Sequence, residues 1–135
     1  MDANVWVAAF EPADPFHAQS EAFLRTANSR RLTLNSPAFM IVEAGCALAR
    51  RTNNPAAGAA VRDRLKQHPA LTLHALDDRL LHTALELGAL HLLRGADSLY
   101  AATAKLVEGP LVSWDQELVQ RAGAVTPTAW LTANA

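Results

Sequence analysis

The chain has 135 residues, of which 50% are hydrophobic and 19% are charged, so we expect one folded domain over residues 1–135 rather than a disordered segment. Its net charge of -1 excludes a strongly basic nucleic-acid-binding protein, although a local basic patch is still compatible with it. A single cysteine excludes an intrachain disulfide, and without a signal-type N-terminus or an apolar run of membrane-spanning length we expect a cytoplasmic protein.

Turn signals divide the chain into helical and extended segments. A capping side chain followed by proline favours the start of a helix. The pairs Asp14-Pro15, Ser36-Pro37 and Asn54-Pro55 are each predicted to start a helix. Asp77 and Asp97 are predicted to cap two more helices. In chain order, the predicted elements are a helix over 14–28, a strand over 31–35, helices over 36–50 and 54–67, a strand over 71–76, helices over 77–87 and 97–107, and strands over 110–114 and 124–126.

Extended segments that alternate with helices indicate an α/β fold whose parallel sheet is covered by helices on both faces. In such sheets, ligands bind at the carboxyl ends of the strands. Asp115 directly follows the predicted strand over 110–114, so we expect it at the ligand-binding edge. Cys46 lies in an apolar run of the predicted helix over 36–50, and we expect it to be buried.

Glu43 is the only charged residue between Arg31 and Arg50. Its neighbours at helical spacing are apolar, so its carboxylate is either buried or reaches water from the edge of the helix. A buried carboxylate without a partner is strongly destabilising. Glu43 is therefore either a surface residue or a functional acid.

Three further acids, Asp2, Asp97 and Asp115, also stand alone in uncharged stretches. Singly, each has an ordinary explanation: Asp97 and Asp115 could cap helices, and Asp2 could be a chain-terminal acid without a role. Together with Glu43, however, they fall in the least polar segments, at strand ends or on helices beside the sheet. In a parallel α/β sheet those places converge on one crevice.

Clustered carboxylates resist joint ionisation unless a cation neutralises them. Oxygen ligands without a cysteine and histidine set suit Mg²⁺ or Mn²⁺, and such ions activate water and stabilise leaving oxygens in phosphoryl chemistry. We therefore predict metal-assisted phosphodiester hydrolysis at these acids. Arg94, three residues before Asp97, is either a phosphate contact or an exposed loop residue.

Four segments in this order resemble the PIN domain, and more narrowly the toxin subunits of VapBC toxin–antitoxin pairs. They are Asp2-Ala3-Asn4-Val5-Trp6-Val7, Glu43 in a long helix, the segment from Gly95 to Ala104, and Leu111-Val112-Ser113-Trp114-Asp115. The resemblance covers essentially the whole chain. It implies a three-layer α/β/α fold with a parallel central sheet, and an endoribonuclease that depends on Mg²⁺ or Mn²⁺.

The resemblance also implies roles and partners. It assigns the metal site to Asp2, Glu43, Asp97 and Asp115, a supporting polar position to Asn4, and a hydroxyl position near the fourth acid to Ser113. The implied partners are an RNA substrate, a small antitoxin whose tail enters the acidic groove, and a second copy in a homodimer.

Two features depart from the family pattern. Only Met1 precedes Asp2, where the family has a strand of several apolar residues, so we expect either a start further upstream or a truncated central strand. The modest net charge does not favour tight RNA binding without a metal. The alternatives are a housekeeping PIN nuclease for RNA processing, a metal- or protein-binding module without catalysis, and a phosphoryl-accepting receiver-like domain.

Overall fold

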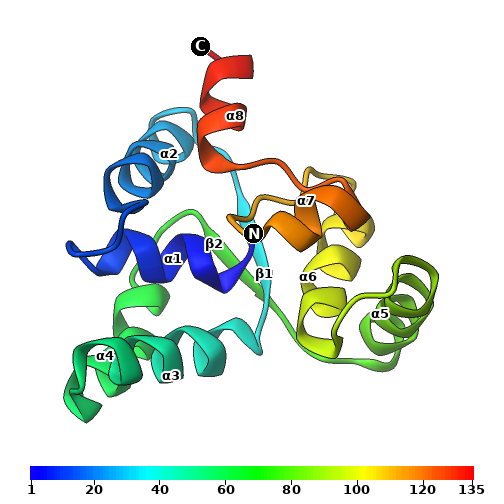
Figure 1. The fold of residues 1–135 in the computed structure, drawn as a ribbon, viewed down its shortest axis with the longest axis horizontal. Coiled ribbons are helices and arrows are strands. Elements are labelled where there is room, and N and C mark those ends of the chain that lie inside the picture. Colours follow the sequence, from blue (N-terminus) through cyan, green and yellow to red (C-terminus); the bar gives the residue numbers. More distant parts are fainter.

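The computed structural model describes residues 1–135 as helices surrounding a small parallel sheet (Figure 1). In chain order the elements are α1 (Ala3–Phe10), α2 (His17–Ser29), β1 (Leu34–Pro37), α3 (Met40–Thr52), α4 (Pro55–Lys66), β2 (Leu71–His74), α5 (Asp78–His91), α6 (Gly95–Leu106), α7 (Gln116–Ala122) and α8 (Pro127–Ala133). Helices α1–α4 lie on one side of the strands and α5–α7 on the other, so the predicted α/β fold is confirmed.

The regular sheet is the parallel pair β1 and β2, with Leu34 opposite Leu71 and Pro37 opposite His74. Residues 1 and 2 continue the hydrogen bonding on the other side of β1. The Met1 amino group donates to the carbonyl of Asn35 at 2.6 Å.

Asp2 continues this connection, because its N–H donates to the carbonyl of Val112 at 3.0 Å. Val112 in turn forms a parallel bridge with Val125. The extended segments therefore follow one another in the order β2, β1, residues 1–2, residue 112 and residue 125. The predicted strands over 110–114 and 124–126 are present only as this single bridge.

The start of α3 differs from the prediction, because Ser36-Pro37 ends a strand instead of opening a helix. The Ser36 hydroxyl donates to the carbonyl of Met1 at 2.6 Å, so it is used to hold the sheet together and not to cap a helix. The helix begins three residues after Pro37, at Met40, and carries Cys46 on its exposed face, against the expectation of a buried position.

Asp115 caps α7, as its ordinary explanation allowed, whereas two helices were not predicted: α1, which Asp2 caps, and α8, which begins at Thr126-Pro127. The predicted cap at Asp97 is wrong. Helix α6 begins at Gly95, and Asp97 is its third residue. The carboxylate of Asp97 accepts no capping hydrogen bond from the backbone of its helix, and it accepts one from Nε of Arg94 instead.

Helices α3 and α4 approach each other closely at two glycines. A Cβ added to Gly45 would lie 3.1 Å from the carbonyl oxygen of Gly58, and one added to Gly58 would lie 2.6 Å from the carbonyl oxygen of Gly45 and 2.7 Å from Cβ of Ala49. No side chain fits between the two backbones at this crossing, so the glycines set the distance between the helices.

The largest fully buried side chains include Trp6 of α1, Met40 of α3, Leu65 of α4 and Tyr100 of α6. They belong to one core that connects the helices to the sheet. Trp6 fixes the first turn of α1, which Asp2 caps, against this core. Met40 does the same for the first turn of α3, which contains Glu43. None of the helices has the length and apolar character that crossing a membrane requires.

Candidate active site

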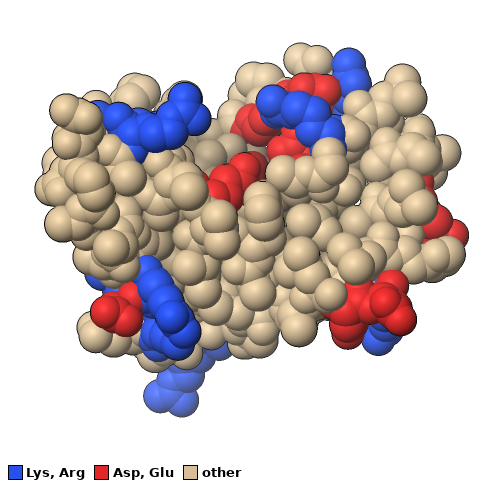
Figure 2. All heavy atoms as spheres, turned by 90° about the horizontal axis from the view of Figure 1, so that it is seen from below, with Lys and Arg blue, Asp and Glu red and all other residues tan.

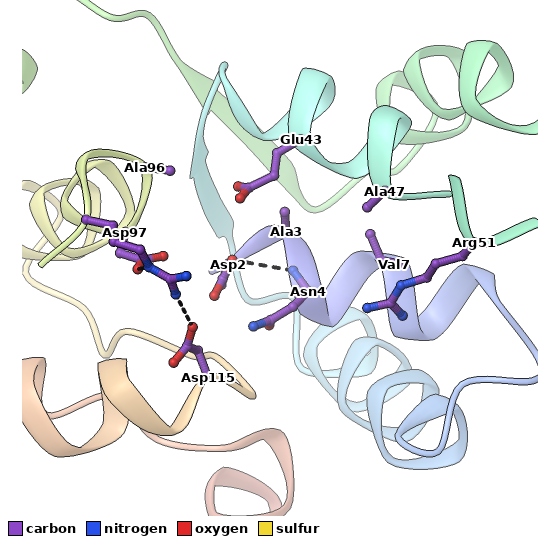
Figure 3. Close-up of a pocket in the computed structure, with 11 residues that line it drawn as sticks. Asp2, Ala3, Asn4, Val7, Glu43, Ala47, Arg51, Ala96, Asp97 and Asp115 are labelled. Carbon is purple, nitrogen blue, oxygen red and sulfur yellow. Dashed lines mark hydrogen bonds and ion pairs between the residues drawn. The ribbon is translucent and has the colours of Figure 1, made fainter. Parts of the chain in front are cut away.

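A cavity of about 320 Å³ opens between α1, α3 and α6. Its lining contains all four of the isolated acids together with Asn4 and two arginines (Figure 3). The lining residues are Asp2, Ala3, Asn4, Val7, Glu43, Ala47, Arg51, Arg94, Ala96, Asp97 and Asp115. The structure therefore brings together acids that lie far apart in the sequence, from residue 2 to residue 115.

Each of the four acids belongs to the beginning of a different helix. Asp2 caps α1, Asp115 caps α7, and Glu43 and Asp97 lie in the first turns of α3 and α6. The amino-terminal ends of these helices therefore meet at the cavity. Helix amino termini carry partial positive charge and unpaired N–H groups, which favour carboxylates and phosphates in their vicinity.

Ser113 lies at the centre of a buried hydrogen-bond network. Its hydroxyl donates to Oδ2 of Asp2 at 2.5 Å, and it accepts from Nδ2 of Asn4 at 3.0 Å and from the backbone N–H of Asp115 at 2.9 Å. Oδ1 of Asn4 accepts the N–H of Trp114 at 3.1 Å. The network fixes the side chain of Asp2 and the chain leading to Asp115 relative to each other.

Asp2 is only 5% exposed, and its pKa is raised to about 6. Burial is the main cause, and the negative charges of Glu43 and Asp97 act in the same direction. The hydrogen bond from Ser113 lowers the pKa and offsets part of this effect. The carboxylate is thus held in a place where its negative charge is poorly compensated.

Glu43 accepts a short hydrogen bond from the hydroxyl of Tyr100, which is fully buried. Tyr100 lies one helical turn after Asp97 on α6, so both side chains face the same direction. Burial, followed by the Glu43 carboxylate, raises the pKa of Tyr100 and keeps its hydroxyl protonated. The tyrosine therefore acts as a fixed donor that orients the Glu43 carboxylate.

Arg94 connects the two acids on the other side of the cavity. Its Nε lies 2.9 Å from Oδ2 of Asp97, and one of its terminal nitrogens lies 3.0 Å from Oδ2 of Asp115. The pKa of Asp97 is nevertheless raised, because burial outweighs the opposing effect of Arg94. The guanidinium of Arg94 thus joins Asp97 to Asp115, the two acids that lie near each other in Figure 3. The arginine partly neutralises the pair.

The donor set of the cavity fits a hard divalent cation. It consists of carboxylate oxygens with an amide and a hydroxyl close behind, and it contains no cysteine or histidine. No three of the acids are close enough together to form a ready-made cation site, and Arg94 lies between two of them. The raised pKa values of Asp2 and Asp97 indicate that the carboxylates lack positive charge, which a cation would supply.

The surface around the acids is mixed in charge. Figure 2 shows acidic side chains at the floor of a hollow, with basic side chains on either side of it. Arg51 and Arg94 are the two basic residues that line the cavity. The cavity is therefore lined by more acidic than basic side chains, with an arginine on each side of the acids.

Two functional candidates escaped the sequence reasoning. Tyr100 could have been found from its position one turn after Asp97, because residues three apart share a helix face. Arg51 carried no such signal, because it is one of two consecutive arginines at the end of α3 and only the packing of α3 against α1 directs it to the cavity.

Comparison with known proteins agrees with this geometry. A family model described as the PIN domain matches residues 1–124, which include all four acids, Asn4 and Ser113. No curated protein matches the chain. PIN domains are generally nucleases that use divalent metal ions and act on RNA. From this match over nearly its whole length, the chain belongs to the PIN domain family.

Proposed function

We propose that the protein is a metal-dependent endoribonuclease. The observation that carries the proposal is the convergence of four carboxylates, each from a different helix start, on one cavity of about 320 Å³ in a chain of the PIN family. An oxygen-only donor set suits Mg²⁺ or Mn²⁺. The two arginines that line the cavity and the helix amino termini around the acids suit a phosphodiester.

Asp2, Glu43, Asp97 and Asp115 would hold the metal ion. When bound, such an ion supplies Lewis acidity that polarises a phosphodiester and lowers the pKa of a water molecule.

The chain itself supplies orientation and charge. Ser113 fixes the carboxylate of Asp2, and Tyr100 fixes that of Glu43, so both ligands are held before the substrate arrives. Arg94 holds Asp97 and Asp115. With Asp97 and Asp115 holding a metal ion, the guanidinium of Arg94 would have donors available for a phosphate oxygen of the RNA.

Incubation of the purified protein with total RNA, with Mg²⁺ or with EDTA, tests this function. We expect cleavage only with Mg²⁺, and products with 5′-phosphates, since water and not the 2′-hydroxyl attacks. Asp97→Asn should abolish cleavage without unfolding, because Asp97 makes no capping bond. Equal cleavage in EDTA, or cyclic phosphate ends, would refute the mechanism.

Glu117→Gln is the matched control for this experiment. Glu117 lies 3.9 Å from Arg94, as a third acid in its surroundings, but it does not line the cavity. Its loss should leave cleavage intact. A similar loss of cleavage in both variants would show that Asp97 acts only through its contact with Arg94.

We further propose that this nuclease is the toxin of a toxin–antitoxin pair. An acidic cavity open to solvent is complementary to a basic tail of a small partner protein. Co-expression with the product of a small neighbouring gene should then suppress RNA cleavage and protect the cell. If no neighbouring product suppresses cleavage, a housekeeping nuclease of RNA processing is the better assignment.

A second copy of the chain is the partner proposed for the outer face of α5. Leu81 and Leu85, which are four residues apart and share one face of the helix, are 46% and 73% exposed. Exposed leucines this close together are typical of an interface. Light scattering should report a dimer, and Leu85→Asp should convert it into a monomer.

A further inference from the structure

A second cavity, of about 400 Å³, adjoins the acidic one. Both cavities are lined by Asn4, Arg51 and Asp115, so the second begins where the acids end. Its other walls are formed by the turn before α2 and by Trp114. Apart from Asp115, none of its lining residues is among the acids proposed to hold a metal ion, so the other residues of this cavity need a separate explanation.

A stacked aromatic pair forms one wall of this second cavity. The rings of Phe16 and Trp114 lie 4.2 Å apart between centroids and are inclined by only 12°. Trp114 is fixed by a hydrogen bond from its ring nitrogen to the hydroxyl of Ser20 at 2.9 Å. Phe16 is 42% exposed although it is large and apolar. Because Trp114 covers one face of Phe16, the exposed surface belongs to the opposite face and the ring edges.

An arginine forms the wall between the two cavities. The side chain of Arg51 is 49% exposed and pairs with Asp14, whose side chain is only 6% exposed. The same carboxylate accepts the backbone N–H of Phe16 at 2.8 Å. Asp14 therefore fixes both the guanidinium and the turn that carries the phenyl ring. Figure 3 shows the guanidinium of Arg51 reaching from the end of α3 back over α1.

A guanidinium has five N–H donors, so pairing with one carboxylate leaves donors of Arg51 available for a second anion. A flat aromatic ring beside such donors matches a nucleotide, since every base has a π-face and every nucleotide unit has a phosphate. The aromatic ring would engage the base, and the arginine would engage the phosphate on the side towards the acids.

We infer that the second cavity is a subsite for one nucleotide of single-stranded RNA, whose base stacks on Phe16 and whose phosphate is bound by Arg51. The inference rests on the proposed function, because the phosphodiester to be cleaved would lie at the acids next to it. The subsite accepts any base by stacking, and it requires an unpaired base, because a base within a duplex has no free face.

Binding to inactive protein tests the subsite separately from catalysis. Asp97→Asn protein in Mg²⁺ is titrated with a short single-stranded RNA that carries one fluorescent adenine analogue, whose emission falls on stacking. A gel confirms that the RNA stays intact. Phe16→Ala in this background should weaken binding roughly tenfold and remove the loss of emission, as expected for one lost base–aromatic stack. Phe16→Tyr should preserve both.

Arg51→Met should weaken binding of the same RNA and reduce its salt dependence by about one phosphate contact. Leu32→Ala is the control, because Leu32 is 38% exposed and lines neither cavity. Phe16→Ala protein that quenches the analogue as fully as the Leu32→Ala protein would overturn the subsite. The subsite would also be overturned if Phe16→Ala weakened binding of a partner protein but not of RNA, because the cavity would then be a protein-docking site.

The two proposals fail in different ways. Wild-type protein that cleaves RNA with Mg²⁺ while Phe16→Ala leaves stacking unchanged refutes only the subsite. Stacking on Phe16 without any cleavage by the wild type supports the subsite and refutes the nuclease.

Discussion

Replacement of Asp2 by asparagine should stabilise the metal-free protein while it abolishes metal-dependent cleavage. The carboxyl group is 5% exposed, and its pKa is raised from 3.8 to about 6, mainly by burial. Between these values the folded protein binds a proton that the unfolded chain has released, so stability falls as the pH rises through this range. Asparagine occupies nearly the same volume and carries no charge.

The size of the effect follows from the two pKa values. One pKa unit corresponds to about 1.4 kcal/mol, so the difference between 3.8 and about 6 makes ionised Asp2 cost about 3 kcal/mol above pH 6. The pKa of about 6 already includes the hydrogen bond from Ser113, and asparagine resembles the protonated carboxyl group in charge and volume. The net expectation is therefore about 3 kcal/mol of added stability at neutral pH, and almost none at pH 4.

Urea denaturation of both proteins in EDTA, from pH 4 to pH 8, measures this difference. The buried amino group of Met1, whose pKa is lowered to about 6, titrates nearby with the opposite sign, so the comparison between variant and wild type is more informative than either curve alone. Mg²⁺ should raise the stability of the wild type more than that of Asp2→Asn. An Asp2→Asn protein that is less stable than the wild type at pH 8 would refute the reasoning.

Three more predictions concern the neighbours of the acids. Arg94→Met should tighten Mn²⁺ binding in calorimetry, because the guanidinium no longer competes for Asp97; weaker binding would instead make Arg94 a support of the loaded site. Tyr100→Phe should cost about 1.5 kcal/mol in urea denaturation and reduce cleavage, since Glu43 loses its buried donor, and an unchanged cleavage rate would contradict that orienting role. Ser113→Ala should cost about 2–4 kcal/mol by the same measurement, because buried N–H groups lose their acceptor, whereas Ser113→Thr should retain most of the stability.

The isolation of each acid in the sequence was a good guide to its place in space. Glu43, Asp97 and Asp115 line one cavity. A carboxylate in an apolar segment is strongly destabilising unless it faces a cavity or accepts a hydrogen bond, so an isolated acid marks such a place. The prediction that Asp97 caps a helix was wrong. The helix begins two residues earlier, at Gly95, and the carboxylate of Asp97 pairs with the side chain of Arg94.

The sheet was the part least visible in the sequence. Residues 1–2 and the bridge between Val112 and Val125 are too short to have a period, and they are extended only because their hydrogen-bonding partners lie beside them. The misplaced start of α3 has the same origin. The hydroxyl of Ser36 binds the carbonyl of Met1, which is a contact between distant segments that local cap statistics cannot anticipate.

The crossing of α3 and α4 extends the functional sensitivity of the protein beyond the cavity. Glu43 and Arg51 occupy opposite ends of α3, and the contact of Gly45 with Gly58 lies between them on the helix. A methyl group at Gly58 would displace α3 as a whole, and the side chains of Glu43 and Arg51 would move with the helix. A search for loss-of-function alleles should therefore recover changes at Gly58, on a helix that contributes no residue to either cavity.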